Sequence, residues 1–219
     1  MNMNKIILKL YNHLKWSFLY RLRKNKLYHY FFLRYYGKIH HQGKTLKLHI
    51  GSGGDYTPGW INIDHNKLVP ADLYMDMRKI RHYCRKDSVN ELKMIHVISY
   101  LRYWEAIDFL NTCYDIMRPG GYLLIEGPDI LKLSENLQKI KSLNVEADYF
   151  MYFECLRAIY AFNMDQIKNK NSFITYAFGW SARHLKYELE KIGFRNIKIS
   201  SPLYHDKLPW RDFHVEATK

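Results

Sequence analysis

One stretch decides the fold that this sequence predicts: Leu46-Lys47-Leu48-His49-Ile50-Gly51-Ser52-Gly53-Gly54, followed after a loop by Gly59-Trp60-Ile61-Asn62-Ile63-Asp64. The first part alternates apolar and polar residues and stops at Gly-x-Gly, which indicates a buried strand that ends in a turn. The second part is a short apolar run that follows a Pro-Gly turn and ends on an acid. Adjacent strand ends of this kind form nucleoside sites in doubly wound α/β sheets, because glycine admits the ligand and the acid accepts ribose hydroxyls.

Two features of this stretch restrict the nucleotide. Tyr56 stands where a dinucleotide fingerprint has its third glycine. Only nine residues, 51–59, separate the expected strands, and a full helical crossover needs more. Both features disfavour a nicotinamide cofactor. The plain alternative is a strand–turn–strand unit in which Gly51 and Gly53 are turn residues and Asp64 is a cap.

The same residues resemble the class I S-adenosylmethionine-dependent methyltransferases. The resemblance is strongest to a small bacterial group with a pattern like Leu-Asn-Leu-Gly-Cys-Gly, a loop and then Gly-Trp-x-Asn-x-Asp. It covers about residues 46–219 and continues through Asp76, His96, Arg118-Pro119-Gly120-Gly121 and Gly127-Pro128-Asp129. It implies an α/β fold with a Rossmann-like, doubly wound, seven-stranded sheet that is mostly parallel, with an antiparallel last strand, plus N-terminal helices.

The resemblance also implies a function. It indicates an enzyme that uses S-adenosyl-L-methionine, releases S-adenosyl-L-homocysteine, and O-methylates a sugar or other small molecule in a bacterial surface-polysaccharide pathway. Two other interpretations stay open: a non-catalytic binding protein on the same fold, and an RNA methyltransferase.

The residue patterns predict where the elements lie. Strands are expected at residues 46–50, 60–64, 71–75, 91–98 and 122–126, and a helix at 103–117 that ends in the turn at 118–121. A helical substrate-side insertion is expected at about 130–181, with helices near 130–141 and 148–163. Ser181 is expected to cap a further helix that stops at Gly193, before two final strands at 194–199 and 213–217.

The N-terminal segment, residues 1–45, differs from the domain at 46–219 in its charge. It holds 10 Lys and Arg and no acid, whereas the whole chain has 34 basic and 21 acidic residues. Apolar residues at helical spacing predict one or two amphipathic helices over residues 5–36. Their apolar face would either cover an edge of the domain or bind an anionic membrane surface. RNA is a weaker candidate partner, because no recognisable RNA-binding motif is present.

Cysteine usage and hydropathy indicate the compartment. Cys84, Cys113 and Cys155 are odd in number, far apart and without a Cys-x-x-Cys motif, which argues against a disulfide framework or a metal site. No apolar run approaches the roughly 20 residues of a membrane span. We therefore expect a cytoplasmic protein, which would be peripheral at the inner face of the membrane where residues 1–36 bind anionic lipid.

By resemblance, the donor-binding residues come from the strand ends. Gly51 and Gly53 would approach the methionine part, Asp64 the ribose hydroxyls, and Asp76 with the Met77 backbone the adenine. The full expected set is His49, Gly51, Ser52, Gly53, Asp64, Asp76, Met77 and His96.

His49 and His96 depart from the family pattern. The family usually has an acid or Asn at the position of His49, and a protonated His there would oppose the donor's ammonium group. His96 begins the segment His-Val-Ile-Ser-Tyr, where the family has a segment like His-Val-Leu-Glu-His. The alternative for His96 is a hydrogen-bonded histidine at a strand end. His65 and His184 are expected to be surface or structural residues.

Methyl transfer from a sulfonium requires mainly positioning, with a base to take the proton of an acceptor hydroxyl. The candidate catalytic residues are His96, Glu126 and Asp129. Asp129 also fits a helix N-cap.

Overall fold

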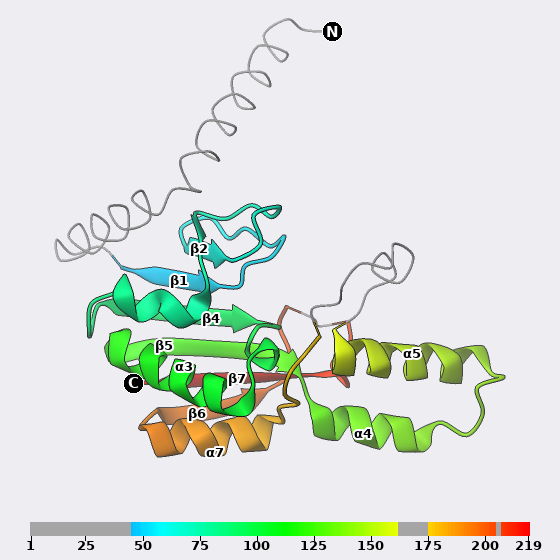
Figure 1. Ribbon diagram of the computed structural model, residues 1–219. Coiled ribbons are helices and arrows are strands. Elements are labelled where there is room, and N and C mark those ends of the chain that lie inside the picture. Colours follow the sequence, from blue (N-terminus) through cyan, green and yellow to red (C-terminus); the bar gives the residue numbers. More distant parts are fainter. Residues whose placement is uncertain (1–44, 162–174, 205–206) are drawn as a thin grey trace, which may run out of the picture.

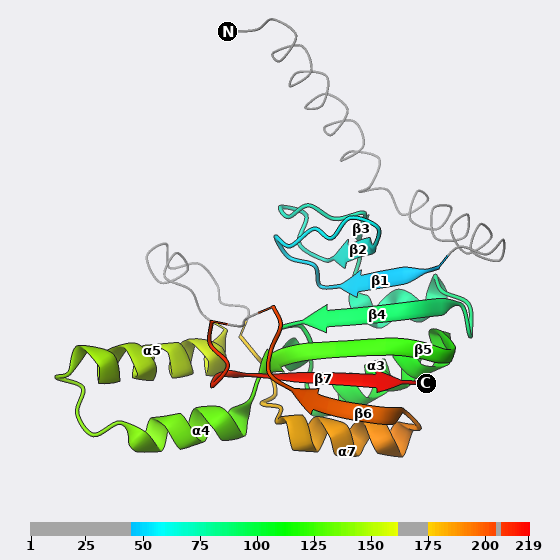
Figure 2. The same cartoon turned by 180° about the vertical axis from the view of Figure 1, so that it is seen from behind.

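The computed structural model describes residues 45–161, 175–204 and 207–219. These residues form a seven-stranded sheet in the order β3-β2-β1-β4-β5-β7-β6 (Figures 1 and 2). The strands are β1 (Lys47–Ile50), β2 (Ile61–Asp64), β3 (Leu73–Tyr74), β4 (Val89–Ile95), β5 (Met117–Pro128), β6 (Arg195–Ser200) and β7 (Asp212–Thr218). Strands β1 to β5 are parallel to one another, and β7 runs antiparallel to both β5 and β6. The predicted mostly parallel sheet with an antiparallel last strand is confirmed.

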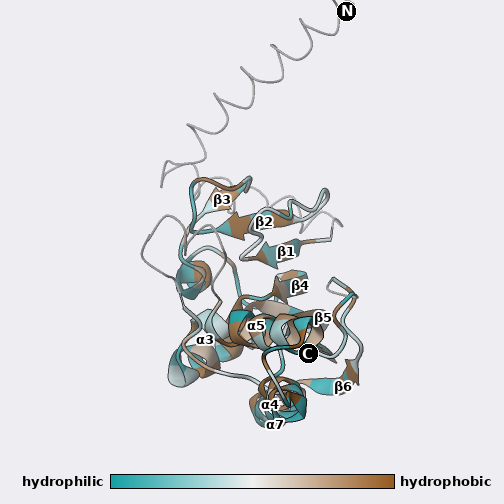
Figure 3. Ribbon diagram, turned by 90° about the vertical axis from the view of Figure 1, so that its right-hand side faces the viewer, coloured by the Kyte–Doolittle hydropathy of each residue, from teal (hydrophilic) through white to brown (hydrophobic). Residues whose placement is uncertain are grey.

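The alternation in β1 divides the sheet into an apolar and a polar face. Leu48 pairs with Ile61 and Leu92, whereas His49 pairs with Asn62 and Lys93. Helices α3 (Tyr103–Ile116) and α7 (Ala182–Ile192) lie together on one face (Figures 1 and 3). The apolar rows join these helices in one core, which also contains Phe109, Leu110, Leu185 and Leu189. Burial of this core positions the carboxyl ends of the parallel strands.

Helices α4 (Ile130–Lys139) and α5 (Glu146–Tyr160) extend beyond the carboxyl ends of the strands (Figures 1 and 2). They belong to the predicted insertion and enclose a second small core of Leu133, Cys155 and Ala158. The cap predicted for α7 is confirmed, because Ser181 Oγ accepts a hydrogen bond from His184 N at 3.2 Å and Gly193 ends the helix with φ 121°.

Two boundary predictions are wrong. The strand expected at 91–98 ends at Ile95, so His96 follows the strand in a left-handed conformation (φ 56°), and a short 3₁₀ helix η2 (Ile98–Tyr100) comes next. The turn expected at 118–121 lies inside β5 as a bulge, because Val89 pairs with Met117 but Glu91 pairs with Tyr122. In both cases the backbone bends locally at a point that apolar periodicity does not mark.

The predicted N-terminal helices lie outside the described residues. Within residues 45–161, 175–204 and 207–219, no helix is long and apolar enough to cross a membrane. Over the same ranges, no group of three or more His, Cys, Asp or Glu is arranged to hold a metal ion. Cys84, Cys113 and Cys155 are free thiols.

Candidate functional site

The candidate site lies where β1 and β4 are neighbours and the chain leaves them in opposite directions along the sheet. Crevices at such switch points bind ligands in open α/β sheets. Gly51 follows β1 with φ 64°, and a Cβ added to it would lie 2.3 Å from Val97 Cγ2. Val97 is the neighbour of His96, so the glycine loop packs directly against the segment that carries the histidine. The site therefore has two adjoining halves. We call residues 46–77 the donor half, and His96 with its neighbours Tyr176, Arg211 and Asp212 the acceptor half.

Backbone hydrogen bonds shape the donor half. The amides of Gly51 and Ser52 donate to the Ile63 carbonyl at 2.7 and 3.1 Å, which ties the loop to the end of β2. The Asp64 carboxylate accepts from Gly53 N at 2.8 Å and from Asn66 N at 2.7 Å. Each carboxylate oxygen keeps a second lone pair, so Asp64 is oriented and can still accept hydroxyl groups.

The glycine loop fits a small polar ligand. Ser52 Oγ is buried without a hydrogen-bond partner, which is unfavourable unless a ligand or water supplies one. Gly53 has φ 53°, and nothing lies within 4 Å of the place where its Cβ would stand. The loop therefore offers open space beside an unsatisfied hydroxyl and an oriented carboxylate, as a nucleoside with a polar tail requires.

His49 points to the polar face of the sheet and is 1% exposed. Its Nδ1 lies 3.3 Å from both Asn62 Oδ1 and Thr57 Oγ1. Burial, with a further contribution from the Lys93 charge, lowers the pKa of His49 to about 4. The ring is neutral at pH 7, so the expected repulsion of the donor's ammonium does not arise. A direct contact between His49 and the donor stays a prediction.

Asp76 and Met77 follow β3, as predicted for residues near the adenine. The Asp76 carboxylate caps the short helix η1 (Met77–His82) and accepts from Arg78 Nε at 3.0 Å and Arg78 Nη2 at 2.7 Å. The hydrogen bond from Arg78 lowers the pKa of Asp76. Met77 packs against the main core. Arg78 also pairs with Glu105 at 2.7 Å, so contact between Asp76 and an adenine amino group requires the carboxylate to be shared with Arg78.

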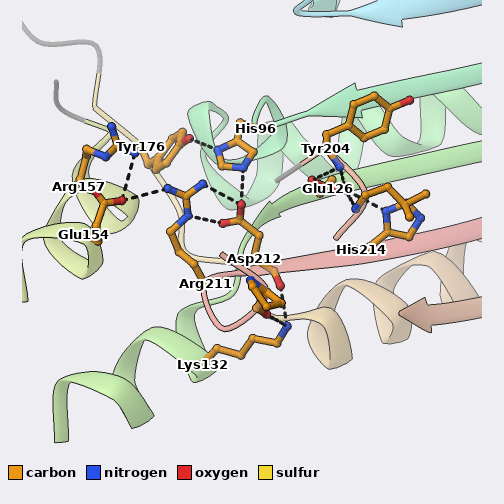
Figure 4. Close-up of polar contacts among 12 residues, drawn as sticks. His96, Glu126, Lys132, Glu154, Arg157, Tyr176, Tyr204, Arg211, Asp212 and His214 are labelled. Atoms are coloured by element: carbon orange, nitrogen blue, oxygen red, sulfur yellow. Dashed lines mark hydrogen bonds and ion pairs between the residues drawn. The ribbon is translucent and has the colours of Figure 1, made fainter. Parts of the chain in front are cut away.

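The acceptor half contains a His–Asp pair (Figure 4). His96 Nε2 lies 2.9 Å from Asp212 Oδ2, and His96 Nδ1 lies 3.2 Å from the Tyr176 hydroxyl. Asp212 is fully buried and also accepts from Arg211 Nε and Nη2 at 3.0 and 2.9 Å. Burial alone raises the pKa of Asp212, but the hydrogen bonds from His96 and Arg211 outweigh it and lower the pKa. An ionised Asp212 holds the proton of neutral His96 on Nε2, which leaves Nδ1 as the acceptor nitrogen.

A small polar cavity of about 160 Å³ adjoins His96. Its polar lining comes from two phenols and two guanidiniums, those of Tyr100, Tyr176, Arg157 and Arg211. Glu154 lies between the two guanidiniums and pairs with Arg157 Nη2 at 3.1 Å and Arg211 Nη1 at 3.3 Å (Figure 4). The cavity thus presents hydrogen-bond donors and one basic nitrogen to a ligand rich in oxygen atoms.

Glu126 and Asp129, the other two predicted catalytic residues, have contacts that join segments of the fold. Glu126 is fully buried and accepts from Leu203 N at 2.9 Å, Tyr204 N at 3.1 Å and His214 Nδ1 at 3.0 Å, so it fastens the segment after β6. A catalytic role of Glu126 stays a prediction.

Asp129 is 5% exposed and caps two helices. It accepts from Leu131 N at 3.0 Å at the start of α4 and from Ala182 N at 3.2 Å at the start of α7. The N-cap alternative is therefore the one that the geometry supports.

Sequence reasoning did not find three residues of the acceptor half, Tyr176, Arg211 and Asp212. The hydrogen bonds from His96 reach 80 residues along the chain to Tyr176 and 116 to Asp212. No spacing rule connects residues so far apart. The one signal was an acid at the start of a strand in which Phe213, Val215 and Ala217 alternate with polar residues, because a buried acid requires a partner.

The comparisons with known proteins support the fold. No protein-family model matches the chain, and no curated protein matches it in sequence. Among solved structures, a SAM dependent methyltransferase from Archaeoglobus fulgidus is similar, with a TM-score of 0.53 and 16% identity over 94% of this chain and 99% of that one. A SAM-dependent methyltransferase from Methanosarcina mazei gives a TM-score of 0.51 and 12% identity over 83% of this chain and 96% of that one. Similarity at these identities shows the fold alone, which is that of the class I methyltransferases.

Proposed function

We propose that this chain is an S-adenosylmethionine-dependent methyltransferase that O-methylates a sugar or other small molecule in a surface-polysaccharide pathway. The observation that carries the proposal is the His96–Asp212 pair, which lies beside the glycine loop at the switch point of a methyltransferase fold. The pair supplies a base where an acceptor would meet the donor. The pathway and the saccharide class rest on the resemblance of the sequence motifs.

Residues of the donor half would hold S-adenosylmethionine. Gly51 and Gly53 would lie against its methionine part, Ser52 Oγ would gain a partner, and Asp64 would accept the ribose hydroxyls. Asp76 and Met77 would lie at the adenine. When bound, the donor supplies a methyl group that is already activated by the sulfonium, so the protein has mainly to position the acceptor and exclude water.

His96 would act as the general base. The Tyr176 hydroxyl lies 3.2 Å from His96 Nδ1. An acceptor hydroxyl would replace it as the hydrogen-bond partner of this nitrogen. The bound donor would supply its methyl group to the acceptor oxygen and leave as S-adenosylhomocysteine. The proton of the acceptor hydroxyl would move to His96 Nδ1, while Asp212 would keep the Nε2 proton in place and stabilise the imidazolium. Burial raises the pKa of Tyr176, so its phenol stays protonated and donates a hydrogen bond.

Calorimetry with donor and product, followed by transfer of labelled methyl to a panel of nucleotide sugars, tests the proposal. Binding of S-adenosylmethionine with turnover on a hydroxyl acceptor is the expected result. Binding of S-adenosylhomocysteine with no turnover on any acceptor would instead indicate a non-catalytic binding protein. RNA binding with a steep salt dependence would indicate an RNA methyltransferase. Binding of NADH without binding of S-adenosylmethionine would contradict the proposal.

For the cellular location, we propose a cytoplasmic enzyme held at the inner membrane face by residues 1–36. Residues 1–45 contain 10 basic residues and no acid. A solvent-exposed surface usually carries charges of both signs, so this one-signed charge is better explained by an anionic partner. Anionic lipid attracts a basic residue near its surface with about 1 kcal/mol. The full chain should sediment with anionic liposomes at low salt, and deletion of residues 1–36 should abolish this. Equal sedimentation of both forms, or none, would contradict membrane attachment.

A further inference from the structure

A second cavity adjoins the acceptor half. It has a volume of about 330 Å³ and lies among the 175–180 segment, α4 and α5. Its lining is mostly apolar and includes Ile130, Leu133, Ile159 and Phe178. It shares two wall residues, Ala158 and Tyr176, with the polar cavity beside His96. The two cavities are therefore neighbours across Tyr176, whose hydroxyl is bonded to the proposed base.

The apolar cavity has walls that several contacts hold in place. The amides of Ala177 and Phe178 donate to the Ser99 carbonyl at 2.8 and 3.2 Å, which ties this segment to η2. A Cβ on Gly179 would lie 3.3 Å from Ile130, so the segment also packs closely on α4. The space lies between the main core, against which Phe178 packs, and the small core around Leu133. It is a gap between two packed units.

An apolar space of this size is unfavourable for a sugar, because sugar hydroxyls would lose hydrogen bonds with water there. It suits an aromatic ring or a short aliphatic chain, since an engineered apolar cavity of about 150 Å³ in another protein holds benzene. The polar cavity offers the opposite surroundings, with His96, two phenols and two guanidiniums. The two adjoining cavities thus match a molecule with one polar and one apolar end.

Given the function proposed above, on which this step rests, we infer that the acceptor is amphipathic. Its hydroxyl-bearing polar head occupies the cavity beside His96, and an aromatic or short aliphatic group attached to that head occupies the apolar cavity. Tyr176 and Ala158 lie at the junction and select for an acceptor that carries both parts. This refines the acceptor class from a free sugar to a hydroxyl compound with an apolar substituent.

Two matched probes test the inference on the full chain: methyl β-D-glucopyranoside and phenyl β-D-glucopyranoside, which differ only in the apolar group. In calorimetry with S-adenosylhomocysteine present, the phenyl compound should bind about 10-fold tighter or more, as expected for burial of an aromatic group. Ile130→Trp, which fills the apolar cavity from α4, should remove that preference. Leu131→Trp is the matched control, because Leu131 is the next residue on the same helix, is 49% exposed and does not line the cavity.

Ile159→Phe, which narrows the cavity from α5, provides a second variant if Ile130→Trp does not fold, and circular dichroism checks folding of each. Equal binding of the two probes by the wild type, binding of neither, or an unchanged preference in both cavity variants would overturn the inference. Donor binding is measured on the same samples. A wild type that binds the donor but shows no phenyl preference contradicts only the amphipathic acceptor, whereas a wild type with a phenyl preference but no donor binding contradicts only the methyltransferase function.

Discussion

The donor half and the acceptor half adjoin each other but are built in opposite ways. In the donor half the Asp64 carboxylate meets Gly53, 11 residues earlier in the chain, and the partners are mainly backbone amides. In the acceptor half His96 meets Tyr176 and Asp212, 80 and 116 residues later, and the partners are side chains. A site built from consecutive strands leaves a motif in the sequence. A site built from distant strands leaves single residues without a pattern.

The two halves also differ in how their charges are balanced. In the donor half, Asp64 is held by neutral amides, and the buried His49 lies within hydrogen-bonding distance of the neutral side chains of Asn62 and Thr57. In the acceptor half, acid and base alternate from Asp212 through Arg211 and Glu154 to Arg157. The donor half is therefore prepared to receive polar groups, whereas the acceptor half is prepared to hold one imidazole in a fixed orientation.

The largest effect is expected at the border between the halves. Gly51→Ala should destabilise the fold by about 2–5 kcal/mol, because the left-handed backbone is strained with a side chain and the new methyl group would clash with Val97. Gly53→Ala should cost only about 1–2 kcal/mol, because the backbone strain is similar but nothing lies near the new methyl group. Urea denaturation of both variants measures the difference. Equal losses would show that Gly51 does not pack the two halves together.

A change confined to the acceptor half should separate catalysis from donor binding. His96→Asn suits the left-handed backbone at this position better than Ala does, and it removes the proposed base. Turnover should fall by about 100-fold or more while donor affinity is unchanged. Methyl-transfer rates and calorimetry measure the two quantities, with the exposed His65→Asn as the control. Equal turnover in His96→Asn and the wild type would leave His96 as a structural residue at the end of β4.

A change confined to the donor half should have the reverse pattern. Asp64→Ala should weaken donor binding by about 1.5–3 kcal/mol, or roughly 10- to 150-fold, because a charge-assisted contact is lost. Calorimetry checks this, and Asp55→Ala supplies a matched control, since Asp55 is an exposed acid beside the same loop. Unchanged affinity in Asp64→Ala would remove Asp64 from the binding site.

The smallest effect is a pH dependence that originates in the donor half. The pKa of His49 is about 4 in the fold and about 6.5 when unfolded, so the unfolded chain binds the proton more tightly. The stability that neutral His49 contributes is complete above pH 6.5 and is lost as the pH falls toward 4. Between pH 7.5 and pH 5 the wild type should therefore lose about 2 kcal/mol more stability than His49→Asn. Parallel denaturation curves at both pH values would contradict this.

His214 provides the contrast with the opposite sign. Burial alone lowers its pKa, but hydrogen bonds to Glu126 and Glu216 outweigh burial and raise the pKa above its ordinary value. Its stabilisation is complete below the ordinary pKa of about 6.5 and is lost as the pH rises through the raised pKa. His214→Asn should therefore be most destabilising in acid, which separates its effect from that of His49 in the same set of measurements.

The particular residues show how far prediction from the sequence reached. The strands that carry Leu48 and Ile63 were predicted from their apolar residues, which alternate with polar residues in the first strand and form a short run in the second. Burial of such rows determines the register in which neighbouring strands pair. The cap at Ser181 was predicted because a local hydrogen bond satisfies it. The contacts of Glu126 with Leu203 and Tyr204 were not predicted, because a polar residue near a strand end can face a ligand or a distant backbone amide, and the sequence does not place the 203–204 segment.

The sequence alone therefore determined which segments form the first strands, the glycine loop after β1 and the acid at the end of β2. Each of these features depends on interactions between residues close together in the chain. Only the tertiary structure decided that His96 meets Asp212, that Tyr176 separates two cavities, and that His49 is buried and neutral. These features depend on which strands become neighbours and on the dielectric surroundings that result. The neighbouring strands and the dielectric surroundings both depend on how the whole chain packs around its core. No short stretch of residues encodes either of them.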